Sequence, residues 1–152
     1  MSDIHWTPSL VEAYITEAAD VLSRLPESRV RGYITSWPPI VRDFCEAYGW
    51  QDAVLRRPPP PADAIDRMDI ALQWLAWLDQ RDTKIVWLRA CGKPWKAVCW
   101  EVGLARAAAH QHWMFALCVI SWKLNGKTVS RHMSKRTLIA ATRQANSVDA
   151  IR

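Results

Sequence analysis

Apolar residues recur along most of the chain at steps of three and four residues, the spacing of one face of an α-helix. The pattern predicts six helices, separated by short segments that contain proline, glycine or aspartate. Their expected ranges are residues 8–25, 38–48, 63–78, 79 or 82–91, 94–102 and 105–124. Because strand-like alternation is almost absent, the sequence predicts an all-α fold, a helical bundle.

Local signals support several of these helix ends. Thr7 and Pro8 suit the cap and first turn of the first helix, and Pro94 suits the first turn of the fifth. Gly103 interrupts the pattern before the sixth helix, which Asn125 and Gly126 close. Residues on one face of this sixth helix are expected to be buried: Ala109, Trp113, Ala116, Leu117, Ile120 and Leu124.

The order of elements suggests how the chain is divided. Residues 1–57 form an acidic N-terminal helical part, and residues 58–62 form a proline linker within the run R-R-P-P-P-P. Residues 63–126 hold the remaining predicted helices as one domain. Residues 127–152 are expected to form a basic, flexible tail, in which residues 134–146 become helical on contact with another surface.

Charge is distributed unevenly. Residues 1–79 carry 7 Lys and Arg against 12 Asp and Glu, residues 80–126 carry 7 against 2, and residues 127–152 carry 6 against 1. This segregation indicates that the C-terminal half faces a polyanion. The start has no signal-peptide pattern, no apolar run is long enough to span a membrane, and the four cysteines are scattered. We therefore expect a cytoplasmic protein without a membrane partner.

The two helices at 94–102 and 105–124, joined through Gly103, make a candidate helix-turn-helix. In such a motif the second helix lies in the major groove of double-stranded DNA. An ordinary helical hairpin has the same spacing, so the charge segregation is what favours DNA as the partner.

The stretch from Ile85 to Leu124, with I-V-W-L-R-A-C-G-K-P-W-K-A-V-C-W-E-V-G-L-A-R, resembles region four of the sigma-70 family of transcription initiation factors. Residues 6–129 resemble uncharacterised helix-turn-helix proteins of alphaproteobacterial tailed phages and prophages, through W-T-P, S-W-P-P-I-V-R-D-F-C-E-A-Y-G-W, R-R-P-P-P and K-P-W-K-A-V-C-W. The resemblances imply a sigma-like helix-turn-helix in a phage or prophage setting, and hence the cytoplasm of a bacterial host cell, with RNA polymerase as a further candidate partner. Ala105 and Ala108 stand where the sigma pattern has Ser and Thr, which puts base reading in question.

The outward side of the second motif helix supplies the candidate base-reading residues Arg106, Ala107, His110 and Gln111. Arg106 can pair with guanine or contact phosphate, Gln111 can pair with adenine, and Ala107 can pack against a thymine methyl group. The candidate phosphate contacts are the basic residues before the motif and in the tail: Lys93, Lys96, Arg131, Lys135, Arg136 and Arg143. Solvated lysines and a tail without a specific target are the alternatives for this second group.

No motif of enzymatic chemistry occurs in the sequence, such as a phosphate-binding glycine loop or a nucleophile elbow. We therefore expect no enzyme, no catalytic residue and no cofactor. A zinc site is conceivable from Cys91, Cys99, His110 and His112. No closely spaced cysteine pair supports it, so no metal is expected.

Ten tryptophans are divided between two expected environments. Those on apolar helix faces are expected in the core: Trp74, Trp77, Trp87, Trp113 and Trp122. Those near helix starts or loops include one or two candidates for binding a protein partner: Trp6, Trp37, Trp50, Trp95 and Trp100.

Three functions fit these expectations. The leading hypothesis is a DNA-binding transcriptional regulator of a phage or prophage. The second is a small terminase-type subunit that recognises DNA for packaging, which requires a ring-shaped homo-oligomer. The third is an interaction module that has lost base reading and binds polymerase or another host protein. The target sequence, the oligomeric state and the choice between activation and repression stay open.

Overall fold

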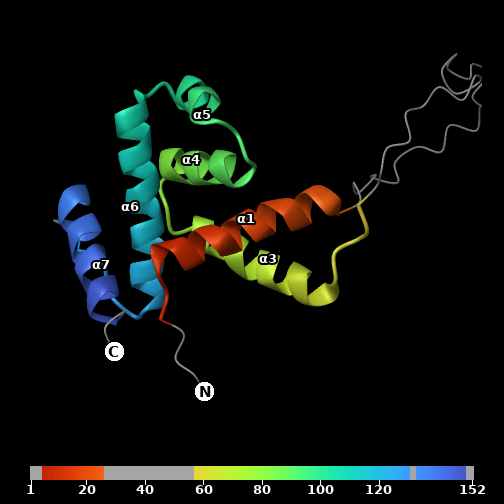
Figure 1. The fold of residues 1–152 in the computed structure, drawn as a ribbon, viewed down its shortest axis with the longest axis horizontal. Coiled ribbons are helices and arrows are strands. Elements are labelled where there is room, and N and C mark those ends of the chain that lie inside the picture. The colour runs from red at the N-terminus through yellow and green to blue at the C-terminus, as the bar shows by residue number, and fades with distance from the viewer. Residues whose placement is uncertain (1–4, 26–56, 131–132, 150–152) are drawn as a thin grey trace, which may run out of the picture.

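The computed structural model describes residues 5–25, 57–130 and 133–149, which form α-helices and no strand (Figure 1). The helices are α1 (Pro8–Arg24), α3 (Ala62–Leu75), α4 (Gln80–Ala90), α5 (Trp95–Val102), α6 (Arg106–Leu124) and α7 (Lys135–Asp149). The all-α fold is therefore confirmed, while the helix expected at residues 38–48 lies outside the described residues. Within the described ranges, no helix combines the length and apolar composition that a membrane span requires.

Helix ends follow the local signals of the sequence. Thr7 caps α1, because its hydroxyl oxygen accepts a hydrogen bond from the backbone N–H of Leu10 at 3.2 Å, and Pro8 is the first helical residue. Gly103 ends α5 in the left-handed region, with φ +70°, and its N–H donates to the carbonyl of Cys99 at 2.9 Å. An L-residue at position 103 would be strained there, so glycine permits the sharp turn into α6.

One hydrophobic core, here called the four-helix core, joins α1, α3, α4 and α6. In Figure 1, α1 and α3 lie side by side, and the C-terminal half of α6 passes close to the start of α1. The buried residues of the core are Val11, Ile15, Ala18, Val21, Ala64, Met68, Ala71, Trp74, Leu75, Val86, Ala116, Leu117 and Ile120. These helices together bury the apolar faces that the sequence predicted for each of them separately.

Two apolar residues expected in the core are exposed. Leu22 continues the apolar spacing of Val11, Ile15 and Ala18 but is 42% exposed, because the last turn of α1 meets its neighbours through Val21 instead. Trp77 is 40% exposed because it lies past the end of α3, where the ammonium group of Lys123 sits 5.4 Å from its ring centre. The lysine gives this ring a polar partner at the surface.

The segment before the proline linker shares its core with the segment after it. Glu17 of α1 and Arg67 of α3 form an ion pair at 2.7 Å. Asn125, just after α6, accepts a hydrogen bond from the N–H of Trp6 at 2.9 Å and donates one to its carbonyl at 2.8 Å. Residues 58–61 lie outside any helix, with Pro61 extended, and α3 begins at Ala62, the last residue of the predicted linker.

Residues of the expected tail form α7, which lies beside α6 and runs in the same direction (Figure 1). Leu138 is fully buried against Cys118 and Val119 of α6. The surface on which this segment becomes helical is therefore α6 of the same chain. Burial raises the pKa of the Cys118 thiol, which keeps it un-ionised at neutral pH and makes it a packing residue.

Candidate nucleic-acid interface

A second, smaller apolar cluster holds α5 against α4 and α6. Its fully buried members are Ile85 and Val98, and Leu88 is 8% exposed. Half-buried side chains close the cluster: Trp95, Val102, Leu104 and Trp113. Only residues 103–105 separate α5 from α6. The cluster and this short turn together hold α5 beside the N-terminal half of α6.

The candidate base-reading residues lie on these first turns of α6. Arg106, Ala107 and His110 are exposed, and Gln111 is half-buried. The imidazole of His110 lies beside two indoles, with ring centres 5.5 Å from Trp95 and 5.4 Å from Trp113. Of the four residues, Arg106 and Ala107 are thus the most accessible to a groove, whereas the ring of His110 is held at the edge of the small cluster.

The start of α6 has no side-chain cap. Ala105 occupies the N-cap position and makes no capping hydrogen bond, and Ala108 is half-buried in the first turn. The backbone N–H groups at this end of the helix are therefore left for solvent or for an external acceptor.

The candidate phosphate contacts do not form one cluster. Lys93 binds the carboxylate of Glu101 at 2.5 Å, a hydrogen bond that lowers the pKa of Glu101. Lys96 is exposed on α5. Arg136 is exposed at the start of α7, and Arg143 lies further along the same helix. Arg131 lies outside the described residues. Lys93 lies just before α5 and Lys96 lies in its first turn, so both belong to the element that precedes Arg106 at the start of α6.

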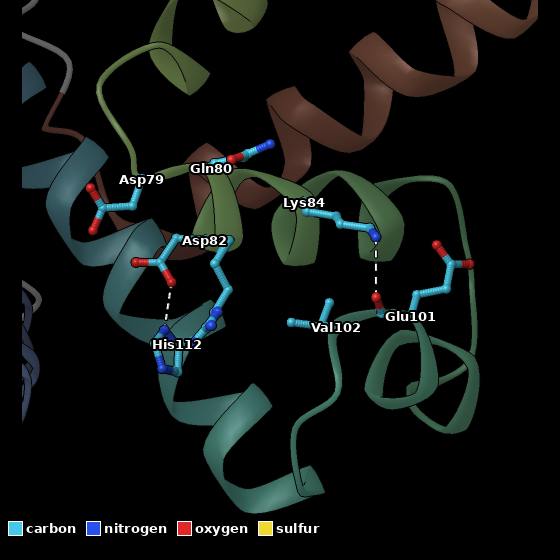
Figure 2. A pocket seen from close by; sticks show the side chains of 8 residues that line it. Asp79, Gln80, Asp82, Lys84, Glu101, Val102 and His112 are labelled. Atoms are coloured by element: carbon cyan, nitrogen blue, oxygen red, sulfur yellow. Dashed lines mark hydrogen bonds and ion pairs between the residues drawn. The ribbon is translucent and has the colours of Figure 1, made fainter.

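Lys135, at the start of α7, contacts two side chains of α6. Its ammonium nitrogen lies 2.9 Å from Nδ1 and 3.2 Å from Nε2 of His112, and 5.3 Å from the ring centre of Phe115. Nδ1 of His112 also lies 2.5 Å from Oδ1 of Asp82. Figure 2 shows the imidazole and this carboxylate turned toward each other. The side chain of Asp82 is 4% exposed, so α4, α6 and α7 meet at a largely buried polar contact.

His112 links a carboxylate and an ammonium group in this contact. A carboxylate can only accept and an ammonium group can only donate. The imidazole of His112 lies between them, with Nδ1 2.5 Å from Oδ1 of Asp82 and the ammonium nitrogen of Lys135 within 3.2 Å of both ring nitrogens. We call these three residues the Asp82–His112–Lys135 contact. No local sequence pattern indicates this contact, because its members lie 30 and 23 residues apart.

A hollow of about 540 Å³ opens beside this contact, between the start of α4, the end of α5 and α6 (Figure 2). Its walls carry charges of both signs: Asp79, Arg81, Asp82, Lys84, Glu101 and His112, with Gln80 and Val102. Lys84 donates to the backbone carbonyl of Glu101 at 3.1 Å. In the part of the chain that the structure describes, no three His, Cys, Asp or Glu side chains are grouped to hold a metal ion. Cys91, Cys99, His110 and His112 are therefore not brought together as one set of ligands.

Comparison with known proteins places the chain in a family. The model of a domain of unknown function, DUF6362, matches residues 23–120, well over half of the 152 residues. No curated protein and no solved structure matches the chain. The matched range includes α3, α4, α5 and most of α6, and therefore both the small cluster and the start of α6. The chain belongs to the DUF6362 family.

Proposed function

We propose that this protein binds double-stranded DNA through α5 and α6 as a helix-turn-helix, and that it regulates transcription in a phage or prophage. The observation that carries the proposal is the turn at Gly103. It joins an eight-residue helix to a longer one whose first turns hold Arg106 and Ala107 in solvent. A recognition helix reads base edges with residues near its N-terminus.

Charge supports a polyanionic ligand at this end. Residues 80–126, which contain α4, α5 and α6, carry five more Lys and Arg than Asp and Glu, since they hold 7 against 2. Lys93, just before α5, and Arg106, the first residue of α6, are both exposed. Lys93 can meet a phosphate there, and Arg106 can meet a base edge. The uncapped N–H groups at the start of α6 can donate to a phosphate oxygen as well.

Binding to DNA across a salt series tests the proposal, first on a random pool and then on the sequence enriched from it. Arg106→Ala is expected to weaken binding to the enriched site by about 1–3 kcal/mol, because a bidentate contact to a base is lost. Arg57→Ala is the matched control. It removes the same charge from a residue that pairs with Asp20 of α1 at 2.6 Å, away from α6, and should change little.

Absence of binding at low salt would reject DNA as the ligand and favour the role as an interaction module. Equal losses for Arg106→Ala and Arg57→Ala would leave a non-specific electrostatic attraction and remove Arg106 from the reading surface. Deleting residues 127–152 is not a suitable test of the basic segment, because it would uncover Cys118 and Val119.

A further inference from the structure

The most exposed large apolar side chain among the described residues is Trp100, at 88% exposure. It lies in the last turn of α5, two positions after Val98, and therefore on the opposite side of the helix from the buried cluster. The outer face of α5 forms a shallow hollow of about 630 Å³ lined by Pro94, Lys96, Ala97, Cys99, Trp100 and Glu101. We call this the outer face of α5.

An indole left in water forgoes much of the favourable burial of a large aromatic surface, and exposed aromatic residues mark protein interfaces. Figure 1 shows α5 at the edge of the molecule, with α4 and α6 on its inner sides. A second protein surface can therefore approach the outer face of α5 without meeting the rest of the molecule.

The residues of this face are arranged for pairing with a copy of itself. Ala97 and Trp100 are three positions apart and form the middle of the face, a small residue one turn before a large one. Lys96 precedes Ala97 on one flank, and Glu101, whose carboxylate also accepts from Lys93 of its own chain, follows Trp100 on the other, so the flanks carry opposite charges. The spacing of Lys96 and Glu101 is that of the flanking g and e positions of a coiled coil.

The signs of the flanks also select an orientation. In a parallel pair of helices around a two-fold axis, a flanking residue meets the opposite flank of the partner five positions later. Lys96 of one copy would then meet Glu101 of the other, twice in each dimer. In an antiparallel pair, equal flanks meet, and Lys96 would face Lys96 of the second copy. Charge complementarity therefore favours the parallel arrangement.

We infer that the outer face of α5 is a self-association surface, on which a second copy of this chain docks with α5 parallel to α5. Ala97 permits close approach of the two helices, and Trp100 of each copy packs on the other. Lys96, a candidate phosphate contact in the sequence, is assigned to Glu101 of the second copy. Stable interfaces bury about 800 Å² per partner. An eight-residue helix offers less, so the dimer is reversible and concentration-dependent.

This inference goes beyond DNA binding and does not rest on it, so its test uses the full chain without DNA. Sedimentation velocity over a concentration series should show the wild-type protein moving from monomer toward dimer. Trp100→Ala should stay monomeric over the same range. Trp77→Ala, which removes an exposed indole after α3, is the matched control and should behave as wild type. A wild-type protein that is monomeric throughout, or a Trp100→Ala variant that dimerises equally, would overturn the inference.

Charge reversal tests the orientation independently. Lys96→Glu gives both flanks a negative charge, and Glu101→Lys gives both a positive charge, so each variant alone should be monomeric. An equimolar mixture should regain the dimer, because every facing pair is then of opposite sign. Circular dichroism of each variant before mixing shows whether it is folded. A mixture of folded variants that sediments as the sum of its separate components would overturn the parallel pairing.

Discussion

The two halves of α6 lie in different surroundings. In the C-terminal half, every residue from Ala116 to Ser121 is buried, because the four-helix core covers one side and α7 covers the other. In the N-terminal half, Ala109 alone is buried, and the side that carries Arg106 and His110 is open. The Asp82–His112–Lys135 contact lies between the two, where α4 and α7 both reach α6.

The residues of each half suit its surroundings. A helix covered all round needs apolar residues all round, whereas a helix covered on one side needs an apolar stripe. The run W-M-F-A-L-C-V-I from Trp113 to Ile120 is apolar at every position, while R-A-A-A-H-Q-H before it is small or polar. One helix thus combines a buried, stabilising segment with an open, polar segment, and substitutions should separate the two.

The largest expected effect is on stability in the covered half. Ile120→Ala removes a fully buried side chain from the four-helix core and should lower the free energy of unfolding by about 2–5 kcal/mol. Trp100→Ala removes a larger side chain from the open end. Because that side chain is solvated, it should cost less than about 0.5 kcal/mol. Chemical denaturation of both variants, under conditions in which wild type is monomeric, measures the difference. Similar losses would show that the open end is part of the stabilising core.

Much of α6 could be predicted from the sequence, because its first buried face is a local pattern. Ala109, Ala116, Leu117 and Ile120 are buried as expected, and Trp113 and Leu124 pack against the core while half-buried. Cys118 and Val119 are buried on a second face, which lies outside the stripe that the spacing predicts. The three- and four-residue spacing predicts a single buried stripe. The run of apolar residues on all sides of α6 already indicates that a second element covers this helix. That cover comes from Leu138, in a segment interpreted as a flexible tail.

A middle-sized effect is expected where the two halves meet. Asp82→Ala leaves the ring nitrogen Nδ1 of the half-buried His112 without its carboxylate partner and should lower the free energy of unfolding by about 1–3 kcal/mol. Asp79→Ala is the matched control. Asp79 is an exposed neighbour at the N-cap of α4 that makes no capping hydrogen bond, so its loss should be small. Equal stability of the two variants would show that the polar contact does not hold the halves of α6 together.

The sequence could not give this contact, for a physical reason. Asp82 stands where a helix start favours an acidic residue, and that local reason suffices to explain it without any partner. From the sequence, His112 is a candidate zinc ligand and Lys135 is a candidate phosphate contact, and neither role points to the other residue. Their partners become visible only when α4, α6 and α7 are packed, since no local spacing connects these residues. Helix ends are set by neighbours in sequence, and buried polar contacts by neighbours in space.

The smallest effect is expected at the exposed ion pair of the open end. Lys93 lowers the pKa of Glu101 below its ordinary 4.5, so the folded state binds this proton less readily than the unfolded state does. The stability that the pair contributes is present above about pH 4.5 and is lost as the pH falls through the lowered pKa of the folded state. Carboxyl NMR of Glu101 should show the lowered midpoint, and Lys93→Met should return it toward 4.5. Added salt should have a similar effect by screening, since both side chains are in contact with solvent. A midpoint that neither change moves would mean that this contact does not help to hold α5 in place.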